Sequence, residues 1–200
     1  MKYSKLIAAI AALCLSAAPV AAEKLSLSKI STYLNGLGTA KAEFTQISDD
    51  GAIATGQLFI RRPGAIRFEY NPPEASLVMA GQGRVAVFDV KSNQPPQMFP
   101  LKRTPLNLIL AKTVNLDRAR MVVGHSQEGP STIVTAQDPE HPDYGQIKLV
   151  FTGNPVELRQ WVVIDGTGQK TTVILGQLTT GVSLSQRLFN IGAEVEDRGL

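Results

Sequence analysis

Apolar side chains near the start of the chain recur every three or four residues, which is the spacing of one face of an α-helix. They are Leu27, Ile30, Tyr33, Leu34 and Leu37. Ser26 or Ser28 can cap such a helix at its beginning, and Gly36 and Gly38 can end it. The pattern therefore predicts one amphipathic helix over residues 27–37.

From residue 41 onward apolar positions alternate with polar ones, which is typical of β-strands with one buried face. The alternating runs cover residues 41–48, 56–62, 65–71, 76–80, 84–90, 121–126, 131–136, 146–152, 157–165 and 170–178. Turns rich in Gly and Pro separate them, and the Pro- and Gln-rich residues 93–97 predict a loop. About ten strands at hairpin spacing favour an antiparallel sandwich or barrel over a parallel α/β sheet.

One short helix interrupts the strands. Thr104 and Pro105 form a typical helix start, with Thr as the N-cap and Pro in the first turn, where its missing N–H is harmless. An apolar stripe of Leu106, Ile109 and Leu110 follows. Because so short a helix is not stable alone, we expect it to lie against the sheet. The simplest arrangement is a curved sheet with two or three helices across its open side.

Strand parity indicates which side chains face these helices. Successive residues of a strand point to opposite faces, so Leu58 and Ile60 share a face with Arg62, and Arg61 lies on the other. The predicted inward surface consists of Leu58, Ile60, Ile66, Phe68, Tyr70, Leu77, Met79, Ile147, Leu149 and Phe151. It is either a filled core, as in most small barrels, or the wall of a ligand cavity.

Arg62 argues against a filled core. A buried and unpaired cation costs several kcal/mol. We therefore expect Arg62 either to reach solvent at the rim of the sheet or to donate hydrogen bonds to carbonyl groups of a covering helix.

The first 22 residues have the three parts of a secretory signal peptide. Lys2 and Lys5 precede an apolar run at residues 6–15, and the small residues at 16–22 suit cleavage before Glu23. The alternative is an uncleaved helix at a membrane interface, since a transmembrane span needs about 20 apolar residues. Cleavage leaves residues 23–200 as a single domain and removes Cys14, the sole cysteine.

Cleavage also changes the charge balance. The whole chain has a formal net charge of +3, and loss of its two leader lysines lowers this to +1. A nearly neutral chain has no electrostatic basis for binding nucleic acid, and we expect no strong adhesion to anionic vesicles at physiological salt.

The sequence contains no catalytic or cofactor motif. Its two histidines, His125 and His141, do not have the spacing of a metal site. Nucleophile-elbow, phosphate-loop and dinucleotide motifs are absent. We therefore expect a protein that is not an enzyme and that uses no metal and no cofactor.

Several motifs follow one another in a characteristic order. They are Phe44-x-Gln46, GQLFIRRP at 56–63, IRFEY at 66–70 with Pro72-Pro73, Val87-Phe88-Asp89 and the segment that begins with Thr104-Pro105. In this order and spacing, residues 27–178 resemble the LolA family of periplasmic outer-membrane lipoprotein carriers. The resemblance implies a mainly β fold with helices: a half-closed antiparallel β-barrel of about 10–11 strands, covered by two or three short helices as a lid.

The resemblance also implies roles for particular residues. Arg62 matches an arginine that bonds the lid backbone in the closed state, and Leu106, Ile109 and Leu110 match part of the lid helix. The residues expected to line the acyl-chain cavity are Phe44, Leu58, Ile60, Ile66, Phe68, Tyr70, Leu77, Met79 and Phe151.

By the same resemblance, the expected function is that of a periplasmic chaperone. It binds the acyl chains of lipoproteins released from the inner membrane and carries them to the outer membrane. The implied partners are an inner-membrane LolCDE-type ABC transporter and, where present, a LolB-like outer-membrane acceptor, with the carrier a monomer. The alternative keeps the fold and makes the chain a periplasmic binding or sensor module for another lipid or amphiphile.

Overall fold

The structure is a computed structural model that describes residues 23–89, 94–118 and 120–200. The expected signal peptide, residues 1–22, lies outside the described residues. The helices of the described part are α1 (Leu27–Gly36), α2 (Leu106–Leu110) and α3 (Ile191–Asp197), with 3-10 turns η1 (Leu101–Arg103), η2 (Pro142–Tyr144) and η3 (Gln186–Phe189). The strands are β1 (Thr39–Ile47), β2 (Ile53–Arg61), β3 (Ala65–Tyr70), β4 (Leu77–Gly81), β5 (Arg84–Phe88), β6 (Gln97–Pro100), β7 (Val122–Glu128), β8 (Ser131–Gln137), β9 (Gln146–Thr152), β10 (Glu157–Ile164), β11 (Lys170–Leu175) and β12 (Thr179–Thr180).

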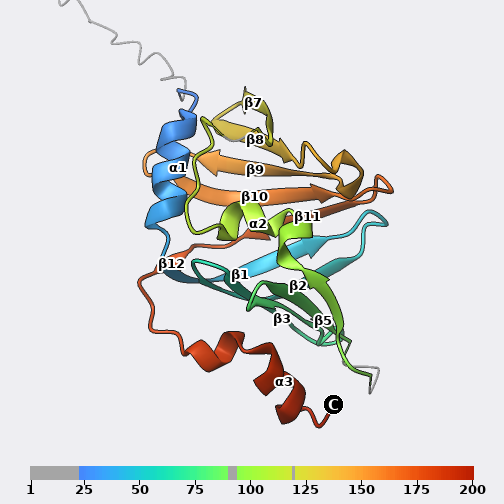
Figure 1. Cartoon of the computed structure of the whole chain (residues 1–200). Helices are drawn as coiled ribbons and strands as arrows, with labels where there is room; N and C mark the ends of the chain where they lie inside the picture. Colours follow the sequence, from blue (N-terminus) through green and yellow to red (C-terminus); the bar gives the residue numbers. More distant parts are fainter. Residues whose placement is uncertain (1–22, 90–93, 119) are drawn as a thin grey trace, which may run out of the picture.

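All twelve strands of the described chain belong to one antiparallel sheet. Its order is β6-β5-β4-β3-β2-β1-β11-β10-β9-β8-β7, with the short β12 paired to β1. Among the described strands, the edges β6 and β7 do not pair with each other, so the sheet remains open. It curves around α1 and α2, whereas α3 lies apart from them (Figure 1). The predicted mainly β fold with covering helices is thereby confirmed.

α1 forms where the apolar spacing predicts it. The Ser26 hydroxyl oxygen accepts a hydrogen bond from the Lys29 N–H at 3.2 Å, and the Leu37 N–H closes the last turn on the Tyr33 carbonyl at 3.1 Å. Ile30 and other residues of the apolar stripe are buried against the sheet. The caps satisfy backbone groups that a helix leaves free at its ends, and the stripe fixes α1 on the concave side.

Some elements are missing from the sequence-based prediction. β6 begins at the end of the Pro- and Gln-rich stretch, and all four of its residues are exposed. Such a strand shows no alternation of buried and exposed positions, and it tolerates proline because it is an edge of the sheet. β12 has only two residues, and η3 and α3 follow where the sequence pattern predicts no element.

The prediction that Leu77 and Met79 face the concave side is wrong. Pairing of β3 with β4 places Leu77 opposite Glu69 and Met79 opposite Arg67, so these residues share the convex face. Val78 takes an inward position instead. The turn between β3 and β4 decides this register, and a shift of one residue moves every side chain of a strand to the other face.

The C-terminal segment lies on this convex face and covers a second, smaller core. Arg67, which is 9% exposed, donates hydrogen bonds to the Glu194 carboxylate at 2.8 Å and to the Leu188 carbonyl at 3.2 Å. Arg61 donates to the Leu184 carbonyl at 2.7 Å. The buried residues of this core are Leu77, Met79, Ala86, Phe88 and Ile191.

Candidate functional site

The concave face of the sheet carries a continuous apolar surface. Strand pairing assembles it, since Leu58 lies opposite Phe68 and Ile60 lies opposite Ile66. Tyr70 is half-buried, and the other predicted residues on this face are buried. The predicted inward residues that the structure brings together here are Phe44, Leu58, Ile60, Ile66, Phe68, Tyr70, Ile147, Leu149 and Phe151.

Aromatic rings form the centre of this face. The Phe44 ring meets Phe68 edge-on at 5.4 Å between centroids and meets Tyr70 at 5.0 Å. Phe68 in turn meets Trp161 at 5.9 Å. Gly56, directly opposite Phe44, leaves room for its ring, because a Cβ there would lie 2.7 Å from the ring. These edge-to-face contacts are favourable, and they give the interior a wide apolar wall.

Tyr70 and Gln46 line an open depression at one end of this wall. The Tyr70 hydroxyl donates a hydrogen bond to the Gln46 side-chain oxygen at 2.7 Å. Burial raises the pKa of Tyr70 to about 12, so its hydroxyl stays protonated near neutral pH. The pair therefore adds hydrogen-bonded polar atoms, and no charge, at the end of the apolar wall.

α2 lies over the concave face and closes it. Of the residues predicted for this helix, Ile109 and Leu110 are buried and Leu106 is half-buried against the main core. Leu108, which the sequence pattern does not single out, is buried as well. Burial of three consecutive residues shows that the sheet and the neighbouring chain enclose this short helix from more than one side.

The predicted N-cap of α2 is wrong by one residue. The helix begins at Leu106, and Pro105 occupies the N-cap position without a side-chain hydrogen bond. The Thr104 hydroxyl donates instead to the Leu101 carbonyl at 2.9 Å. Thr104 therefore closes the preceding 3-10 turn η1 and does not cap α2, contrary to the prediction from the sequence pattern.

The corner that follows β2 is bonded to the C-terminal end of α2. Arg62 Nη2 donates a hydrogen bond to the Ala111 carbonyl at 2.6 Å, and the Gly64 N–H donates to the Leu110 carbonyl at 2.9 Å. Gly64 has a φ of +80°, a conformation that favours glycine. Because a helix leaves its last carbonyl groups without partners, this corner both satisfies α2 and attaches it to the sheet.

Arg62 is only partly satisfied in this position. Its Nε is buried and has no hydrogen-bond partner among the described residues. Burial lowers the pKa of Arg62, yet an arginine remains charged at any physiological pH. A hydrogen bond from a charged donor contributes about 1.5–3 kcal/mol, and an unsatisfied buried donor costs about 1–3 kcal/mol. The bond to Ala111 therefore stabilises the position of α2, and the unsatisfied Nε offsets part of this contribution.

The loop after α2 is bonded to α1, a feature that the sequence analysis misses. Asn35 Nδ2 donates to the Val114 carbonyl at 2.8 Å, and the Val114 N–H donates to Asn35 Oδ1 at 2.9 Å. The Leu116 N–H donates to the Ser31 hydroxyl at 2.9 Å. Ser31 and Asn35 lie four residues apart and share one face of α1. Two polar residues at this spacing beside the apolar stripe are the signal that can reveal such contacts.

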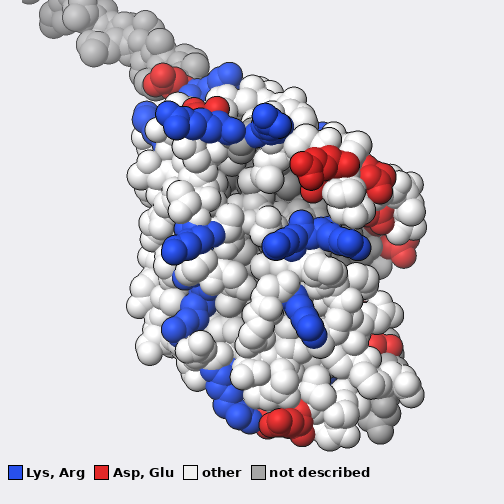
Figure 2. Space-filling view, in the orientation of Figure 1, with Lys and Arg blue, Asp and Glu red and all other residues white. Residues whose placement is uncertain are grey.

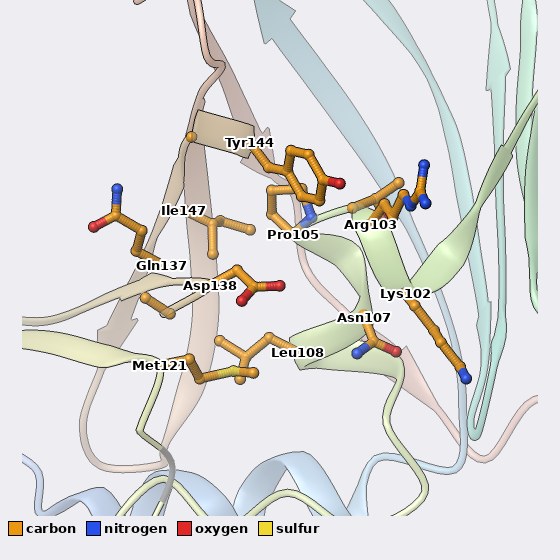
Figure 3. A pocket seen from close by; sticks show the side chains of 13 residues that line it. Lys102, Arg103, Pro105, Asn107, Leu108, Met121, Gln137, Asp138, Tyr144 and Ile147 are labelled. Carbon is orange, nitrogen blue, oxygen red and sulfur yellow. The ribbon is translucent and has the colours of Figure 1, made fainter. Parts of the chain in front are cut away.

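A small cavity lies between α2 and the ends of β8 and β9. Its volume is about 80 Å³, whereas sites for small molecules measure about 300–1,000 Å³. In Figure 3, Lys102 and Arg103 point away from its apolar side chains. In this conformation the concave face is therefore filled beside α2, whereas the open depression next to Tyr70 has a volume of about 330 Å³. The apolar lining residues include Pro105, Leu108, Met121 and Ile147, and the polar ones include Asn107, Asp138 and Tyr144.

The part of the chain that the structure describes lacks both a metal-site pattern and a membrane-spanning helix. There, no group of three or more His, Cys, Asp or Glu side chains is placed to hold a metal ion. No helix of this part is long and apolar enough to cross a membrane. His125 Nε2 lies 2.8 Å from the Leu25 carbonyl oxygen, and His141 stacks on Tyr144 with 4.6 Å between centroids. Both histidines thus make local structural contacts.

Similar proteins point to one family. The family described as outer membrane lipoprotein carrier protein LolA matches residues 35–192. An outer-membrane lipoprotein carrier protein of Methylococcus capsulatus is 24% identical over 176 residues, which cover 84% of each chain. One of Pseudomonas aeruginosa is 24% identical over 191 residues, which cover 90% of each chain.

A solved structure has a similar fold. It is a putative outer membrane lipoprotein-sorting protein domain from Vibrio parahaemolyticus, with a TM-score of 0.50 and 9% identity over 84% of this chain and 97% of that one. At this identity the likeness concerns the fold alone. The family match, in contrast, extends over most of the sequence, and the chain therefore belongs to the LolA family.

Proposed function

We propose that this chain is a periplasmic chaperone that binds the acyl chains of lipoproteins released from the inner membrane and carries them to the outer membrane. The observation that carries the proposal is an apolar concave face closed by a short helix, which a few polar contacts attach at Arg62, Gly64 and Asn35. Membership of the LolA family and the names of its relatives support this role.

The acyl chains would occupy the concave face after α2 moves away from it. The cavity beside α2 is too small for them, so Ile109 and Leu110 must leave the covered part of the face first. An acyl chain can then replace the apolar contacts that α2 gives up, because its burial contributes about 0.8 kcal/mol per CH₂ group. The wall of this site would be Phe44, Leu58, Ile60, Ile66, Phe68, Tyr70 and Phe151.

Arg62 would act as the latch of the covering helix. In the closed state its guanidinium bonds the Ala111 carbonyl and keeps Nε buried without a partner. Opening breaks the bond, and it also lets water reach the unsatisfied Nε. Since these effects oppose each other, Arg62 favours the closed state only moderately. The contact can then shift the equilibrium between an open state that holds cargo and a closed state that has released it.

The role requires partners on both membranes. A lipoprotein with three acyl chains leaves a bilayer at a negligible rate, so loading needs a donor that supplies energy. We propose a LolCDE-type ABC transporter as the donor and a LolB-like protein as the acceptor, where present, with this chain acting as a monomer. The location rests on the signal-peptide pattern of residues 1–22. The transfer forms and breaks no covalent bond, so it needs no catalytic residue and no cofactor.

Native mass spectrometry of the protein isolated from the periplasm of its host tests the proposal. We expect a one-to-one complex with triacylated lipoprotein. Val78 lies half-buried at the open end of the concave wall, and Val78→Glu should abolish this complex. Ile174 is 39% exposed and lies opposite Thr45 on the convex side, so Ile174→Glu is the matched control.

Two results would count against lipoprotein carriage. Co-purification of a different lipid or amphiphile, bound in the same Val78-dependent manner, would support a binding or sensor module of this fold. Isolation of the folded protein without any amphiphile would contradict both roles.

A further inference from the structure

Unpaired basic side chains lie on the covering segment, which we define as residues 101–118. They are Lys102, Arg103, Lys112 and Arg118, and all four are exposed. The ion pairs between described residues include none of them. The covering segment holds only one acidic residue, Asp117, so its formal charge is +3 whereas residues 23–200 together carry +1. The positive charge of the protein is therefore concentrated on this segment.

Three of these cations line adjoining depressions beside α2. Lys102 and Arg103 line the depression between α2 and the ends of β8 and β9, and Arg118 lines the next depression. Both depressions share Leu108 and Met121, so they adjoin. Figure 2 shows Lys and Arg side chains spread over this side of the molecule, with a group of carboxylates at the upper right and others at the top left and at the bottom. The β8–β9 connection carries carboxylates at Asp138, Glu140 and Asp143.

An exposed aromatic ring borders the same surface. Phe99 on the edge strand β6 is 46% exposed, and it pairs with Val85, whose side chain belongs to the concave core. Phe99 therefore points to the side of the sheet that the covering segment occupies. Lys102 and Arg103 follow it by three and four residues. A ring next to basic side chains is typical of residues that enter a bilayer interface, where the ring lies at headgroup level.

We propose that the covering segment and Phe99 form a docking surface for an anionic phospholipid bilayer. Four separate cations without fixed partners match a surface that offers phosphate groups at any position, and each Lys or Arg near such a surface strengthens binding about fivefold. The binding is weak and reversible, because one partly exposed ring gives little apolar anchoring. The mouth of the concave face then meets the bilayer surface.

Flotation of the purified, cargo-free protein with vesicles tests this surface. We expect binding to vesicles of phosphatidylethanolamine with phosphatidylglycerol, loss of most binding when salt is raised to about 0.15 M or above, and no binding to phosphatidylcholine vesicles. The double variant Lys102→Glu/Arg103→Glu should bind at least about 25-fold more weakly. Phe99→Ser should weaken binding at every salt concentration without changing its salt dependence.

The matched control reverses two charges on the convex face. Lys41 and Lys148 lie on β1 and β9 with their side chains away from the core, and Lys41→Glu/Lys148→Glu should leave vesicle binding within about twofold of the wild type. Thermal unfolding of each variant verifies that it is folded. Absence of binding to anionic vesicles at low salt, or equal losses in the two double variants, would overturn the proposal. Because the protein carries no cargo in this assay, the outcome is independent of lipoprotein carriage.

Discussion

The guanidinium of Arg62 lies 2.6 Å from the carbonyl oxygen of Ala111, and this hydrogen bond joins the corner after β2 to the end of the helix that closes the concave face. The neighbouring Arg61 makes a bond of the same kind, at 2.7 Å, to the Leu184 carbonyl on the convex face. Two consecutive arginines therefore attach two different segments, one over the interior and one outside it.

Replacing Arg62 with Leu should favour the open state. The change removes a charged-donor bond of about 1.5–3 kcal/mol and leaves the apolar wall intact. We expect Arg62→Leu to accept lipoprotein as the wild type does and to pass it on slowly, because the closing reaction that helps to expel cargo becomes less favourable. Two quantities measure this effect: the amount of loaded carrier that accumulates, and the rate at which loaded carrier transfers its lipoprotein to an acceptor.

Arg61→Leu is the matched control for this experiment. It removes a bond of similar length and the same type, but from the C-terminal segment, so transfer should remain close to that of the wild type. Equal transfer rates for Arg62→Leu and the wild type would show that the bond to Ala111 does not govern release.

A hydrophobic fluorescent probe should bind the native protein, and a long-chain amphiphile should displace it. Because the closed interior offers a cavity of only about 80 Å³ beside α2, binding must wait for the cover to open, and Arg62→Leu should bind the probe faster. Stopped-flow fluorescence measures these rates. A cooperatively folded protein that binds no probe would mean that the concave face remains a filled core.

Asn35→Ala should loosen the loop after α2 without affecting the Arg62 corner. The variant removes both hydrogen bonds to Val114 and should destabilise the protein by about 1–3 kcal/mol. Hydrogen exchange should accelerate at the Val114 amide and remain slow at Gly64, whose amide bonds Leu110. Asn71→Ala, which removes an exposed hydrogen bond to Thr55, is the control and should leave the exchange rates of both amides unchanged. Faster exchange at Val114 in this control would argue against a local effect of Asn35.

Stability should fall in acid as Glu194 becomes protonated. Burial alone raises the pKa of Glu194, but hydrogen bonds and positive charge from Arg67 and Arg198 outweigh it and hold the pKa below its usual value. A carboxylate with a lowered pKa stabilises the folded state fully above its unfolded pKa of about 4.3, and this contribution is lost as the pH falls through the folded pKa.

Melting temperatures across this acid range measure the effect. Glu194→Gln should be less stable than the wild type at neutral pH, by roughly 1–3 kcal/mol, and the difference should shrink as the pH decreases below about 4. Glu196 is exposed, and Glu196→Gln should show the pH profile of the wild type. A constant difference between Glu194→Gln and the wild type at all pH values would contradict the assigned charge contacts.

Local patterns in the sequence were sufficient to predict α1 and to identify which side chains of β2 and β3 face inward. A serine cap and a three- and four-residue spacing define α1 within one stretch of chain. Likewise, a tight corner at Pro63-Gly64 joins β2 to β3, so alternation along both strands places Leu58 and Phe68 on the same face. In each case the information lies in neighbouring residues.

The tertiary structure alone decided the features that depend on distant partners. Leu77 and Met79 face outward because the register of β4 is set by its pairing with β3, which alternation within β4 does not reveal. The sequence pattern does not predict α3, because this helix is stabilised on the convex face by residues far from it in the chain, from β3 to β5, including Arg67. The basic surface is likewise not evident from a net charge of +1, since only folding places Lys102 and Arg103 at one depression and Arg118 at the adjoining one. Hydrogen bonds and packing between residues far apart in the chain determine these features, and a sequence pattern records only the local preferences on which they act.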